Sequence, residues 1–357
     1  MNTLKTDRGL KKSNNKVFNT TEVVLPGIVE PSGLLISKRT LNSPSAGQVV
    51  VKVEASGISF AEQSMRRGRY YDQPKFPFTP GYDLVGTVVD VGSNVDSSLI
   101  GKRVAALTKI GGWASYVLIN VNDLLNVPDD IAPDEAETMI VNGITAWQML
   151  HRKAKIQSGQ TILVHGANGG VGTILVQLAQ HAGVRVIGTS STRHHDALRA
   201  QGVEPLDYND PDLAKSVRKL APQGVDAVFD HLGGESVYTS YSLLNSTGKL
   251  ICYAIASALN DTGSFMKPFM LLLGQLTWWN IIPNGHKSFF YNIWAGHKIN
   301  NKKFQKNLQE DFSELLKLLA SGIIKPKIAA SFTLEEITSA MELAESRTVY
   351  GKIIITP

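Results

Sequence analysis

The sequence predicts an α/β protein in which a doubly wound parallel sheet, with helices on both faces, is joined to a β-rich domain. Three observations predict this fold class. Apolar and polar residues alternate with period 2 through much of the first third of the chain, as in half-buried antiparallel strands. Short β-branched runs then alternate with helical stretches, and a glycine-rich turn joins the first of these runs to its helix. The length of 357 residues is sufficient for two domains.

The chain divides into three predicted parts. Residues 1–20 are rich in Asn, Lys and Thr and are predicted to be a disordered tail. Residues 21–133 and 311–357 are predicted to form the β-rich substrate and catalytic domain. Residues 134–310 are predicted to form a dinucleotide-binding domain that is inserted into it.

The β-rich domain is predicted from its alternating segments and the turn residues between them. The clearest strand segments are 49–55, 84–92, 101–107 and 113–119. Gly, Ser and Asn separate these segments, so an antiparallel barrel or sandwich is expected rather than parallel βαβ units. Near the C-terminus, helices are predicted over 308–319 and 334–346, followed by a strand over 351–357.

Strand and helix patterns alternate in the inserted domain. A helix is predicted over 133–154, because a proline and two acidic residues stand at its start. The predicted strands are 161–166, 184–190, 225–231 and 249–254. The predicted helices are 171–182, 194–201, 210–220 and 235–245. Alternation at this spacing indicates a parallel sheet that is covered by helices.

The charge distribution and the cysteine count exclude several classes of protein. The net charge is +5, but residues 1–16 alone carry +4, so the remainder lacks the basic face that nucleic-acid binding needs. The single cysteine, Cys252, excludes intramolecular disulfides and metal sites built from several cysteines, and is expected to be a small buried hydrophobe. This cysteine usage favours a reducing, cytoplasmic location, and the first residues lack the apolar core of a signal peptide.

An apolar segment over 265–296 contains three of the five tryptophans, Trp278, Trp279 and Trp294. Its part without charged residues, 268–286, is interrupted by Gly, Gln, Asn and Pro, which argues against a membrane-spanning helix. Three interpretations remain open for the segment: packing between the domains, a wall for a hydrophobic substrate, or weak contact with a membrane surface or a partner.

The glycine-rich turn predicts a dinucleotide site. Gly166, Gly169 and Gly172 lie directly between a predicted strand and a helix. Glycines at this spacing allow a tight turn and a close approach of the backbone to a pyrophosphate, which then binds at the helix N-terminus. The alternative is a glycine-rich turn that binds no ligand.

The residues after the next strand indicate whether the site prefers NAD(H) or NADP(H). NAD sites usually have an acidic residue about 20 residues after the fingerprint, where it binds the ribose diol. Here the run that starts at Thr189 contains four hydroxyl side chains and Arg193, and no acid occurs before Asp196. Hydroxyls and a guanidinium suit the 2′-phosphate, so NADPH is predicted. The same hydroxyls can also cap the following helix.

Several short motifs occur in an order and spacing that is specific to one family. They are Gly57-Ile58-Ser59-Phe60, Pro80-Gly81-Tyr82-Asp83, Asn142-Gly143-Ile144-Thr145-Ala146, Gly169-Gly170-Val171-Gly172, Asp207-Tyr208, Asp230 to Gly234, Trp278-Trp279-Asn280 and Gly351-Lys352. With them, residues 21–357 resemble the zinc-independent quinone-oxidoreductase type of medium-chain dehydrogenase/reductase. Within that type they are most similar to the vesicle amine-transport protein homologues.

The resemblance implies a fold and an activity. The β-rich domain is expected to be a GroES-like barrel and the inserted domain a Rossmann domain. Ser59 and Tyr82 match the positions of the catalytic Cys and His ligands in zinc-dependent relatives, so no metal is expected. The expected activity is hydride transfer from NADPH to a small hydrophobic substrate, either a quinone or the activated C=C of an α,β-unsaturated carbonyl. Relatives also imply a homodimer.

The resemblance further implies residue roles. Tyr70, as hydroxyl donor, and Ser59 are the expected catalytic side chains. The expected cofactor-binding residues are Asn142, Thr145, Gly169, Gly170, Val171, Gly172, Thr189, Ser190, Arg193, His194, Tyr208 and Arg347. Of these, Arg193, Tyr208 and Arg347 are expected near the 2′-phosphate, and His194, where many relatives have lysine, is the alternative basic contact. Ser59 and Ser64 stand where relatives commonly have asparagine and tyrosine, which leaves the substrate chemistry open. His165 and His231 are expected to be structural. Two other functions therefore stay open: an enoyl-thioester reductase, and a non-catalytic NADPH-binding interaction protein.

Overall fold

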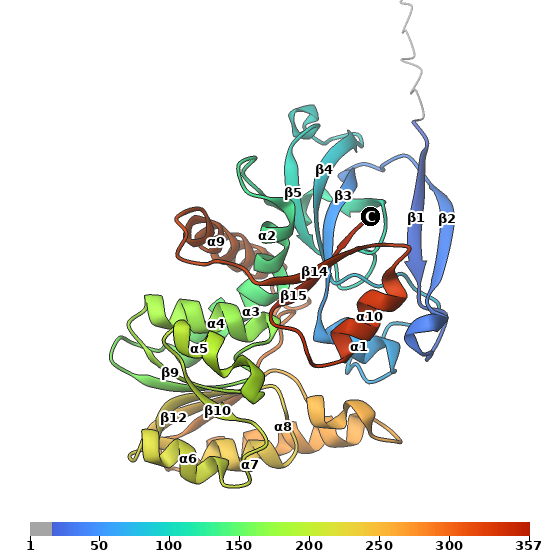
Figure 1. The fold of residues 1–357 in the computed structure, drawn as a ribbon. Helices are drawn as coiled ribbons and strands as arrows, with labels where there is room; N and C mark the ends of the chain where they lie inside the picture. The colour runs from blue at the N-terminus through green and yellow to red at the C-terminus, as the bar shows by residue number, and fades with distance from the viewer. Residues whose placement is uncertain (1–15) are drawn as a thin grey trace, which may run out of the picture.

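The β-rich domain is built from both ends of the chain. The computed structural model describes residues 16–357 and contains two domains (Figure 1). The strands of this domain are β1 (Phe18–Val24), β2 (Leu35–Leu41), β3 (Gln48–Ile58), β4 (Asp83–Val91), β5 (Arg103–Leu107), β6 (Tyr116–Asn120), β7 (Leu124–Asn126), β14 (Ile328–Thr333) and β15 (Lys352–Thr356). Its helices are α1 (Phe60–Arg66) and α10 (Ile337–Glu345), and α2 (Pro133–Thr138) packs against β3 and β4.

A seven-stranded sheet joins these segments. Six strands follow the order β14-β15-β3-β4-β5-β7, and β6 pairs with β3, while β1 and β2 form a separate antiparallel pair. Val51, Leu84 and Val104 come from three neighbouring strands and share one buried core. The C-terminal strand pairs with β3, where Ile354 lies opposite Gly57. This pairing places the C-terminal strand inside the sheet of the β-rich domain, between β14 and β3.

The inserted domain contains the predicted doubly wound parallel sheet. Its strands are β8 (Thr161–His165), β9 (Arg185–Ser190), β10 (Glu204–Asp207), β11 (Val225–Asp230), β12 (Leu244–Cys252) and β13 (Lys287–Phe290), in the order β10-β9-β8-β11-β12-β13. Its helices are α3 (Ile144–Trp147), α4 (Gly170–His181), α5 (His195–Ala200), α6 (Leu213–Leu220), α7 (Glu235–Ser242), α8 (Met266–Ile281) and α9 (Asn301–Ala320). In Figure 1, α4 and α5 cover one face of the sheet, and α6, α7 and α8 cover the other. The predicted fold class is confirmed.

Two predicted boundaries differ from the structure. Strand β1 begins at Phe18, because it pairs with β2 and buries Phe18 and Thr20, so residues 18–20 are ordered and not part of the tail predicted over 1–20. Residues 1–15 lie outside the described part of the chain. The boundary predicted after residue 310 falls inside α9, a continuous helix whose apolar face packs against α3. The chain therefore returns to the β-rich domain only after this helix.

The helix predicted over 133–154 is present but is not a regular α-helix. Two π-helical stretches, Met139–Gly143 and Gln148–Ala154, flank the short α3. Each stretch changes the rotation of the side chains along the helix, which is a frequent feature of functional sites. The first of them carries Asn142.

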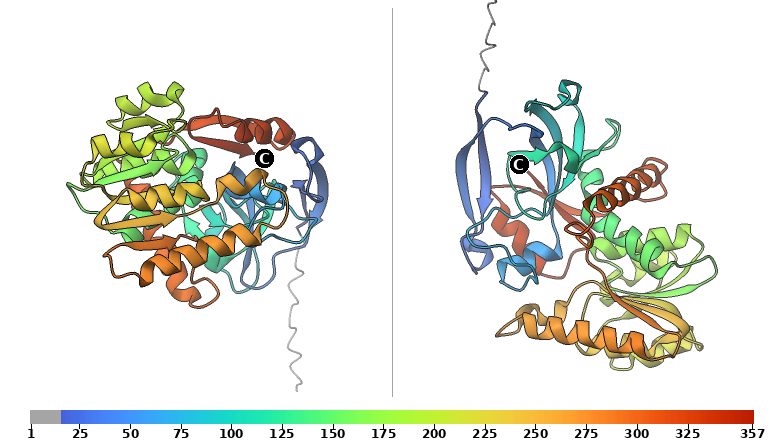
Figure 2. Two further views of the ribbon diagram at one scale, coloured as in Figure 1. Left: turned by 90° about the horizontal axis from the view of Figure 1, so that it is seen from below. Right: turned by 180° about the vertical axis from the view of Figure 1, so that it is seen from behind.

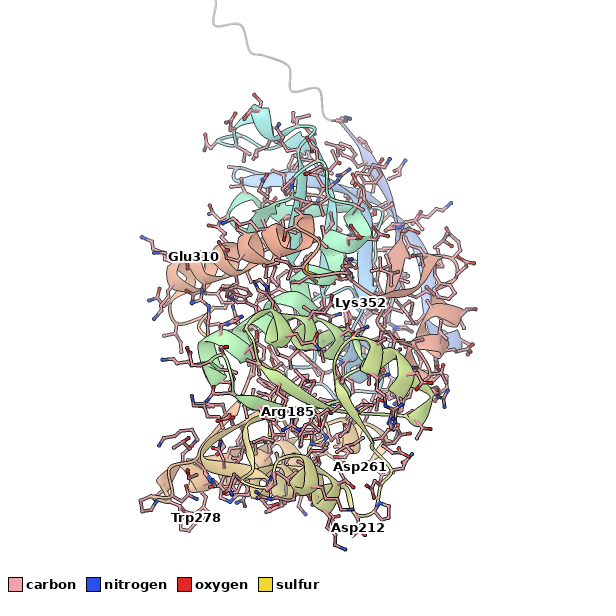
Figure 3. The ribbon with its side chains drawn as sticks, turned by 60° about the vertical axis from the view of Figure 1, so that its left-hand side comes forward. Arg185, Asp212, Asp261, Trp278, Glu310 and Lys352 are labelled. Atoms are coloured by element: carbon pink, nitrogen blue, oxygen red, sulfur yellow. The ribbon has the colours of Figure 1, made fainter. Side chains whose placement is uncertain are left out.

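The apolar segment over 265–296 forms α8 and β13. Helix α8 runs along the outer face of the sheet (Figure 2) and buries Leu272, Leu276 and Trp279. Its other side exposes large apolar side chains, including Leu271 and Trp278, and Trp278 lies at the outer edge of the molecule (Figure 3). Among the described helices, none has the length and hydrophobicity needed to cross a bilayer. The three buried side chains pack within the inserted domain, in a core that includes Val228 and Leu250, and not between the two domains as one interpretation proposed.

Candidate active site

A cleft of about 650 Å3 is lined by residues of both domains. It lies at the carboxyl ends of β8 and β11, where the strand order reverses, the usual ligand position in a doubly wound sheet. All but two of the predicted site residues line it. They are Ser59, Tyr70, Asn142, Thr145, Gly169, Gly170, Val171, Gly172, Thr189, Ser190, Tyr208 and Arg347.

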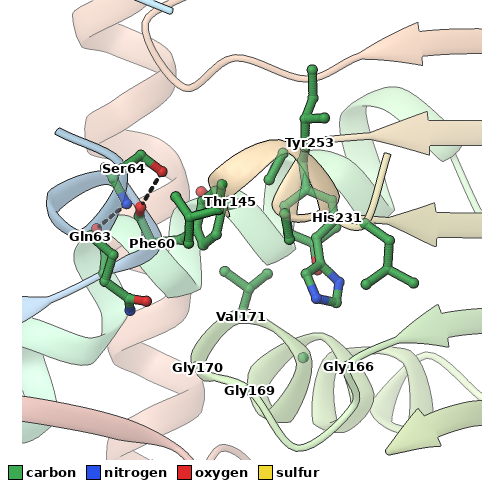
Figure 4. A pocket seen from close by; sticks show the side chains of 18 of the residues that line it. Phe60, Gln63, Ser64, Thr145, Gly166, Gly169, Gly170, Val171, His231 and Tyr253 are labelled. Carbon is green, nitrogen blue, oxygen red and sulfur yellow. Dashed lines mark hydrogen bonds between the residues drawn. The ribbon is translucent and has the colours of Figure 1, made fainter. Parts of the chain in front are cut away.

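The turn between β8 and α4 leaves the backbone open to the cleft (Figure 4). Gly166 has a φ of +66°, which favours glycine. A Cβ at Gly166 would lie 2.6 Å from Cε1 of His231. A Cβ at Gly172 would lie 2.2 Å from the carbonyl oxygen of Gly166. No larger residue fits at either position without a shift of its neighbours.

The N-terminus of α4 has the donors that a pyrophosphate needs. The first helical N–H to find an acceptor is that of Thr173, which donates to the Gly169 carbonyl at 2.9 Å. The N–H groups of the three preceding residues have no acceptor among the described residues. The Asn142 Nδ2 is also buried without a hydrogen-bond partner in residues 16–357, and a Cβ at Gly170 would lie 2.5 Å from it. These unpaired donors fit a bound diphosphate.

Of the residues predicted to contact a 2′-phosphate, some line the polar end of the cleft and others lie outside it. Tyr208 and Arg347 line the cleft, together with Ser190 and its neighbour Ser191. The Thr189 hydroxyl also faces the cleft, but it already accepts the Gly166 N–H at 3.3 Å and pairs with His165. Thr189 therefore supports the glycine turn in addition to any contact with a ligand.

Arg193 and His194 do not line the cleft. A short 3-10 helix over Thr192–His194 turns this segment, so that Arg193 is exposed and its Nε donates to the Ser191 Oγ at 3.3 Å. The His194 ring is buried and lies 5.5 Å from the Tyr350 ring. Their predicted contact with the phosphate stays a prediction, whereas Arg347 is a cation that does line the cleft.

Tyr70 brings a hydroxyl group into the other half of the cleft. Its Oη lies 2.6 Å from that of Tyr82, and burial raises the pKa of Tyr70, with Tyr82 as a further cause. Tyr70 therefore stays protonated at neutral pH. The Tyr71 ring stacks on Phe269 with 5.4 Å between ring centroids, so this half of the cleft is strongly aromatic. A wall for a hydrophobic substrate was one interpretation of the 265–296 segment.

Ser59 also lines the cleft, but its hydroxyl has structural partners. It caps α1, where its Oγ accepts the Ala61 N–H, and its O–H is paired with the Glu62 carboxylate. Glu62 accepts the Ser59 N–H at 2.9 Å and the Tyr82 N–H at 2.7 Å. Because the proton of Ser59 is committed to Glu62, this side chain can only accept a hydrogen bond from a ligand.

The comparisons with known proteins agree with this geometry. Residues 45–129 match the alcohol dehydrogenase GroES-like domain, and residues 201–355 match the zinc-binding dehydrogenase family. The human synaptic vesicle membrane protein VAT-1 homolog is 33% identical over 320 residues, which cover 88% of this chain and 80% of the human protein. The chain belongs to the medium-chain dehydrogenase/reductase family.

Two further relatives illustrate this oxidoreductase family. A 2-haloacrylate reductase from Burkholderia is 27% identical, with 92% of this chain and 96% of that protein covered. A mycobacterial protein solved in complex with NADPH superimposes with a TM-score of 0.80 at 25% identity, covering 95% of this chain and 100% of that one. Our chain is a medium-chain dehydrogenase/reductase of the zinc-independent quinone-oxidoreductase type, near the VAT-1 homologues.

A buried charge cluster adjoins the cleft, where Lys352 is one of the lining residues. Lys352 Nζ lies 3.2 Å from Glu137 Oε1 and 3.9 Å from Asp83 Oδ2, and all three side chains are buried. Burial raises the pKa of Glu137, and the neighbouring Asp83 raises it further. Burial alone would lower the pKa of Lys352, but the two acids raise it above its ordinary value. The absence of a side chain at Gly57 leaves room for the Glu137 carboxylate, since a Cβ at Gly57 would lie 2.1 Å from Glu137 Oε1.

His231 lies beside the glycine turn and faces the cleft. Its ring is 5.9 Å from that of Tyr253, and Nδ1 has no hydrogen-bond partner among residues 16–357. The neighbouring Asp230 holds the loop after β11, because Oδ1 accepts the N–H of Leu232 at 2.8 Å and Oδ2 accepts the hydroxyl of Ser240 at 2.7 Å. Burial lowers the pKa of His231 to about 4, so the ring is neutral at pH 7.

The low pKa of His231 predicts a loss of stability in acid. Between about pH 6.5 and 4 the unfolded chain binds a proton that the folded chain does not, so the free energy of unfolding falls as the pH falls, by up to about 3 kcal/mol from this residue. His231→Asn should flatten the pH dependence of urea unfolding, whereas His181→Asn, at the exposed end of α4, should not. Parallel curves for wild type and His231→Asn would contradict this.

Sequence reasoning missed several residues of the site. In the sequence, Tyr82 stands in a family motif, at a position that lacks a zinc ligand, and Trp294 stands in an apolar segment, which indicates no contact between them. The structure joins them, because Trp294 Nε1 donates to the Tyr82 hydroxyl at 2.7 Å. Glu137 carried no local signal beyond its place at the start of a helix. Cys252 and His165 are buried, as expected.

Proposed function

We propose that the protein is an NADPH-dependent reductase that acts without a metal ion and transfers hydride to a quinone or to the activated C=C bond of an α,β-unsaturated carbonyl compound. The observation that carries the proposal is a single cleft that joins the free N–H groups of α4 to the aromatic region around Tyr70. The first part suits a diphosphate and the second suits a planar, hydrophobic acceptor.

The residues of the cleft have distinct proposed tasks. Bound NADPH supplies a hydride from its nicotinamide ring. Thr145 and Asn142 would orient the nicotinamide end, and the backbone of the glycine turn would hold the pyrophosphate. The protonated Tyr70 would donate a hydrogen bond to the carbonyl oxygen, where negative charge develops during reduction. Phe269 and Ile293 would exclude water.

The reaction class is tested by measuring NADPH consumption with a panel of quinones, alkenals and enoyl thioesters. Turnover with quinones or alkenals supports the proposal. Turnover confined to enoyl thioesters would favour the enoyl-thioester reductase. Tight NADPH binding without turnover on any acceptor would leave a non-catalytic NADPH-binding protein. Binding of neither NADPH nor NADH would overturn all three.

The preference for NADPH predicts a selective effect of charge reversal at the polar end of the cleft. Arg347→Glu places a negative charge in the cleft lining and Arg193→Glu places one just outside it. Each should weaken NADPH binding by about tenfold or more, and NADH binding little, since only NADPH carries the 2′-phosphate. Fluorescence titration with both nucleotides provides the measurement.

A matched control for these variants is Arg199→Glu. Arg199 lies on α5, is exposed and pairs with Asp196 at 2.8 Å, outside the cleft lining. It should leave both affinities nearly unchanged. Equal weakening of NADPH and NADH by Arg347→Glu would refute the proposed 2′-phosphate contact.

The proposed partners and location rest on the resemblance and on composition. We expect a homodimer in a reducing, cytoplasmic setting, with no nucleic-acid partner. Weak contact with a membrane surface is a further expectation, for which the exposed side of α8, with Leu271 and Trp278, is the candidate surface. Light scattering of the purified protein and co-sedimentation with anionic vesicles test these expectations.

A further inference from the structure

A chain of hydrogen bonds leads from Trp294 to the cleft. Trp294 Nε1 donates to the Tyr82 hydroxyl at 2.7 Å, and the Tyr82 and Tyr70 hydroxyl oxygens are 2.6 Å apart. The three residues come from the loop after β13, the segment before β4 and the segment after α1. Tyr70 and Tyr82 line the cleft, whereas Trp294 lies behind them.

The chemistry of the three groups determines which of them donates and which accepts in each hydrogen bond. An indole N–H can only donate, so the Tyr82 oxygen accepts from Trp294 and its own proton must go elsewhere. Among residues 16–357, the acceptor within hydrogen-bond distance of the Tyr82 hydroxyl is the Tyr70 oxygen. Tyr70 therefore accepts from Tyr82, and the proton of Tyr70 is left to point away from the pair.

The neighbours of Tyr70 indicate that its O–H group points into the cleft. The other hydroxyl near Tyr70 is that of Tyr71, at a long 3.4 Å. Tyr71 in turn donates to Asn292 Oδ1 at 2.9 Å. A ligand oxygen in the cleft would thus be a better acceptor for the proton of Tyr70 than Tyr71 is.

Packing holds the donor at the start of the chain. The Trp294 ring stacks on Phe304 of α9, with 5.9 Å between centroids and an interplanar angle of 17°. The backbone N–H of Trp294 donates to Asn292 Oδ1 at 2.9 Å. At Tyr82, the backbone N–H donates to the buried Glu62 carboxylate. Both ends of the Trp294–Tyr82 bond are therefore fixed by other contacts.

We propose that Trp294 and Tyr82 are positioning residues that fix Tyr70 as a hydrogen-bond donor toward the cleft, and so select ligands that present a carbonyl or quinone oxygen. The proposal rests on the proposed function for its catalytic consequence. Without Trp294, the Tyr70–Tyr82 pair can reverse, which turns the proton of Tyr70 away from the ligand. No proton leaves Tyr70 in this role, in agreement with its raised pKa.

The test is a double-mutant cycle between Trp294→Phe and Tyr70→Phe. Phenylalanine at 294 keeps an aromatic ring for the stack on Phe304 and removes the N–H. With naphthoquinone as acceptor, Trp294→Phe should lower kcat about three- to tenfold, the range of one neutral hydrogen bond, with unchanged affinity for NADPH. Tyr82→Phe should have a similar effect. In the Tyr70→Phe background, Trp294→Phe should have no further effect.

The matched control is Trp278→Phe, because Trp278 is exposed on α8 and lies outside the cleft lining. It should leave kcat unchanged. An unchanged kcat in Trp294→Phe, or the same loss with and without Tyr70, would overturn the inference, since a purely structural role of Trp294 does not depend on the Tyr70 hydroxyl.

A binding experiment separates this inference from the proposed function. Calorimetric titration with naphthoquinone in the absence of NADPH should show about three- to tenfold weaker binding to Trp294→Phe, and no such difference in the Tyr70→Phe background. If the wild type lacks turnover but the binding measurements show this coupling between Trp294 and Tyr70, the reductase proposal fails and the positioning role stands. If turnover is present and the binding cycle shows no coupling, the positioning role fails alone.

Discussion

Lys352→Met is expected to lower the free energy of unfolding at neutral pH by about 3–5 kcal/mol, the usual cost of removing one partner from a buried ion pair. Lys352 is the cation at the centre of a cluster with Asp83 and Glu137, and Glu62 lies close enough to feel its charge. All of these side chains are buried, so water cannot replace the lost charge. Urea unfolding followed by circular dichroism provides the measurement.

The pH dependence and a second variant make this prediction specific. Without Lys352 the pKa values of Glu62 and Glu137, which burial already raises and Lys352 lowers, rise further in the folded protein, which then binds protons that the unfolded chain does not. The stability of Lys352→Met should therefore recover as the pH falls from 8 to about 5. Glu137→Gln should restore part of the loss, since it removes one unpaired carboxylate. A loss below about 1 kcal/mol, typical of surface pairs, would contradict the role of Lys352.

Gly172→Ala is expected to weaken NADPH binding by about 100-fold, equivalent to the loss of one or two charge-assisted hydrogen bonds to the pyrophosphate. The added Cβ would lie 2.2 Å from the Gly166 carbonyl oxygen and 2.9 Å from Ala167 Cα. Both neighbours are backbone atoms, so the turn itself has to move and the free N–H groups of α4 move with it. Fluorescence titration with NADPH provides the measurement.

The matched control is Gly274→Ala on α8, where an added Cβ meets nothing within 4 Å. It should leave NADPH binding unchanged. Gly170→Ala separates a loss of NADPH binding from a folding defect, because the nearest atom to its added Cβ is the Asn142 amide nitrogen, at 2.5 Å, which is part of a side chain and can move. It should weaken binding without changing the unfolding midpoint by more than a few degrees. Unchanged NADPH affinity in both Gly172→Ala and Gly170→Ala would show that the turn does not hold the cofactor.

The glycine turn illustrates what local sequence signals can predict. The spacing of Gly166, Gly169 and Gly172 between an apolar run and a helical pattern identified the β8–α4 turn, and the structure has it there. The constraint is local, because a tight strand-to-helix turn needs a positive φ and a lack of side chains within a few residues. The alternating strands and the order of the inserted domain were predicted for the same reason.

Arg193 illustrates a feature that local sequence signals do not predict, namely the position of a side chain relative to a cleft. Its place after β9 and its charge predict a contact with the 2′-phosphate, which stays a prediction because Arg193 lies outside the cleft lining. Arg347, for which the same contact is expected, lines the cleft from the C-terminal segment. The position of one side chain relative to a cleft depends on how the chain turns after the strand. Here the 3-10 helix over Thr192–His194 decides it, and hydrophobic periodicity does not encode that turn.

By itself, the amino-acid sequence determined the two-domain α/β architecture and the strand–turn–helix fingerprint, since each depends on residues that are neighbours along the chain. The count of one cysteine likewise excluded intramolecular disulfides and metal sites built from several cysteines. Tertiary structure alone brought Trp294 to Tyr82, 212 positions away, and Lys352 to Glu137. These contacts form when β15 pairs with β3 and the loop after β13 packs against the β-rich domain. A hydrogen bond or ion pair between such distant segments leaves no periodic trace in either segment, so only the folded chain reveals it.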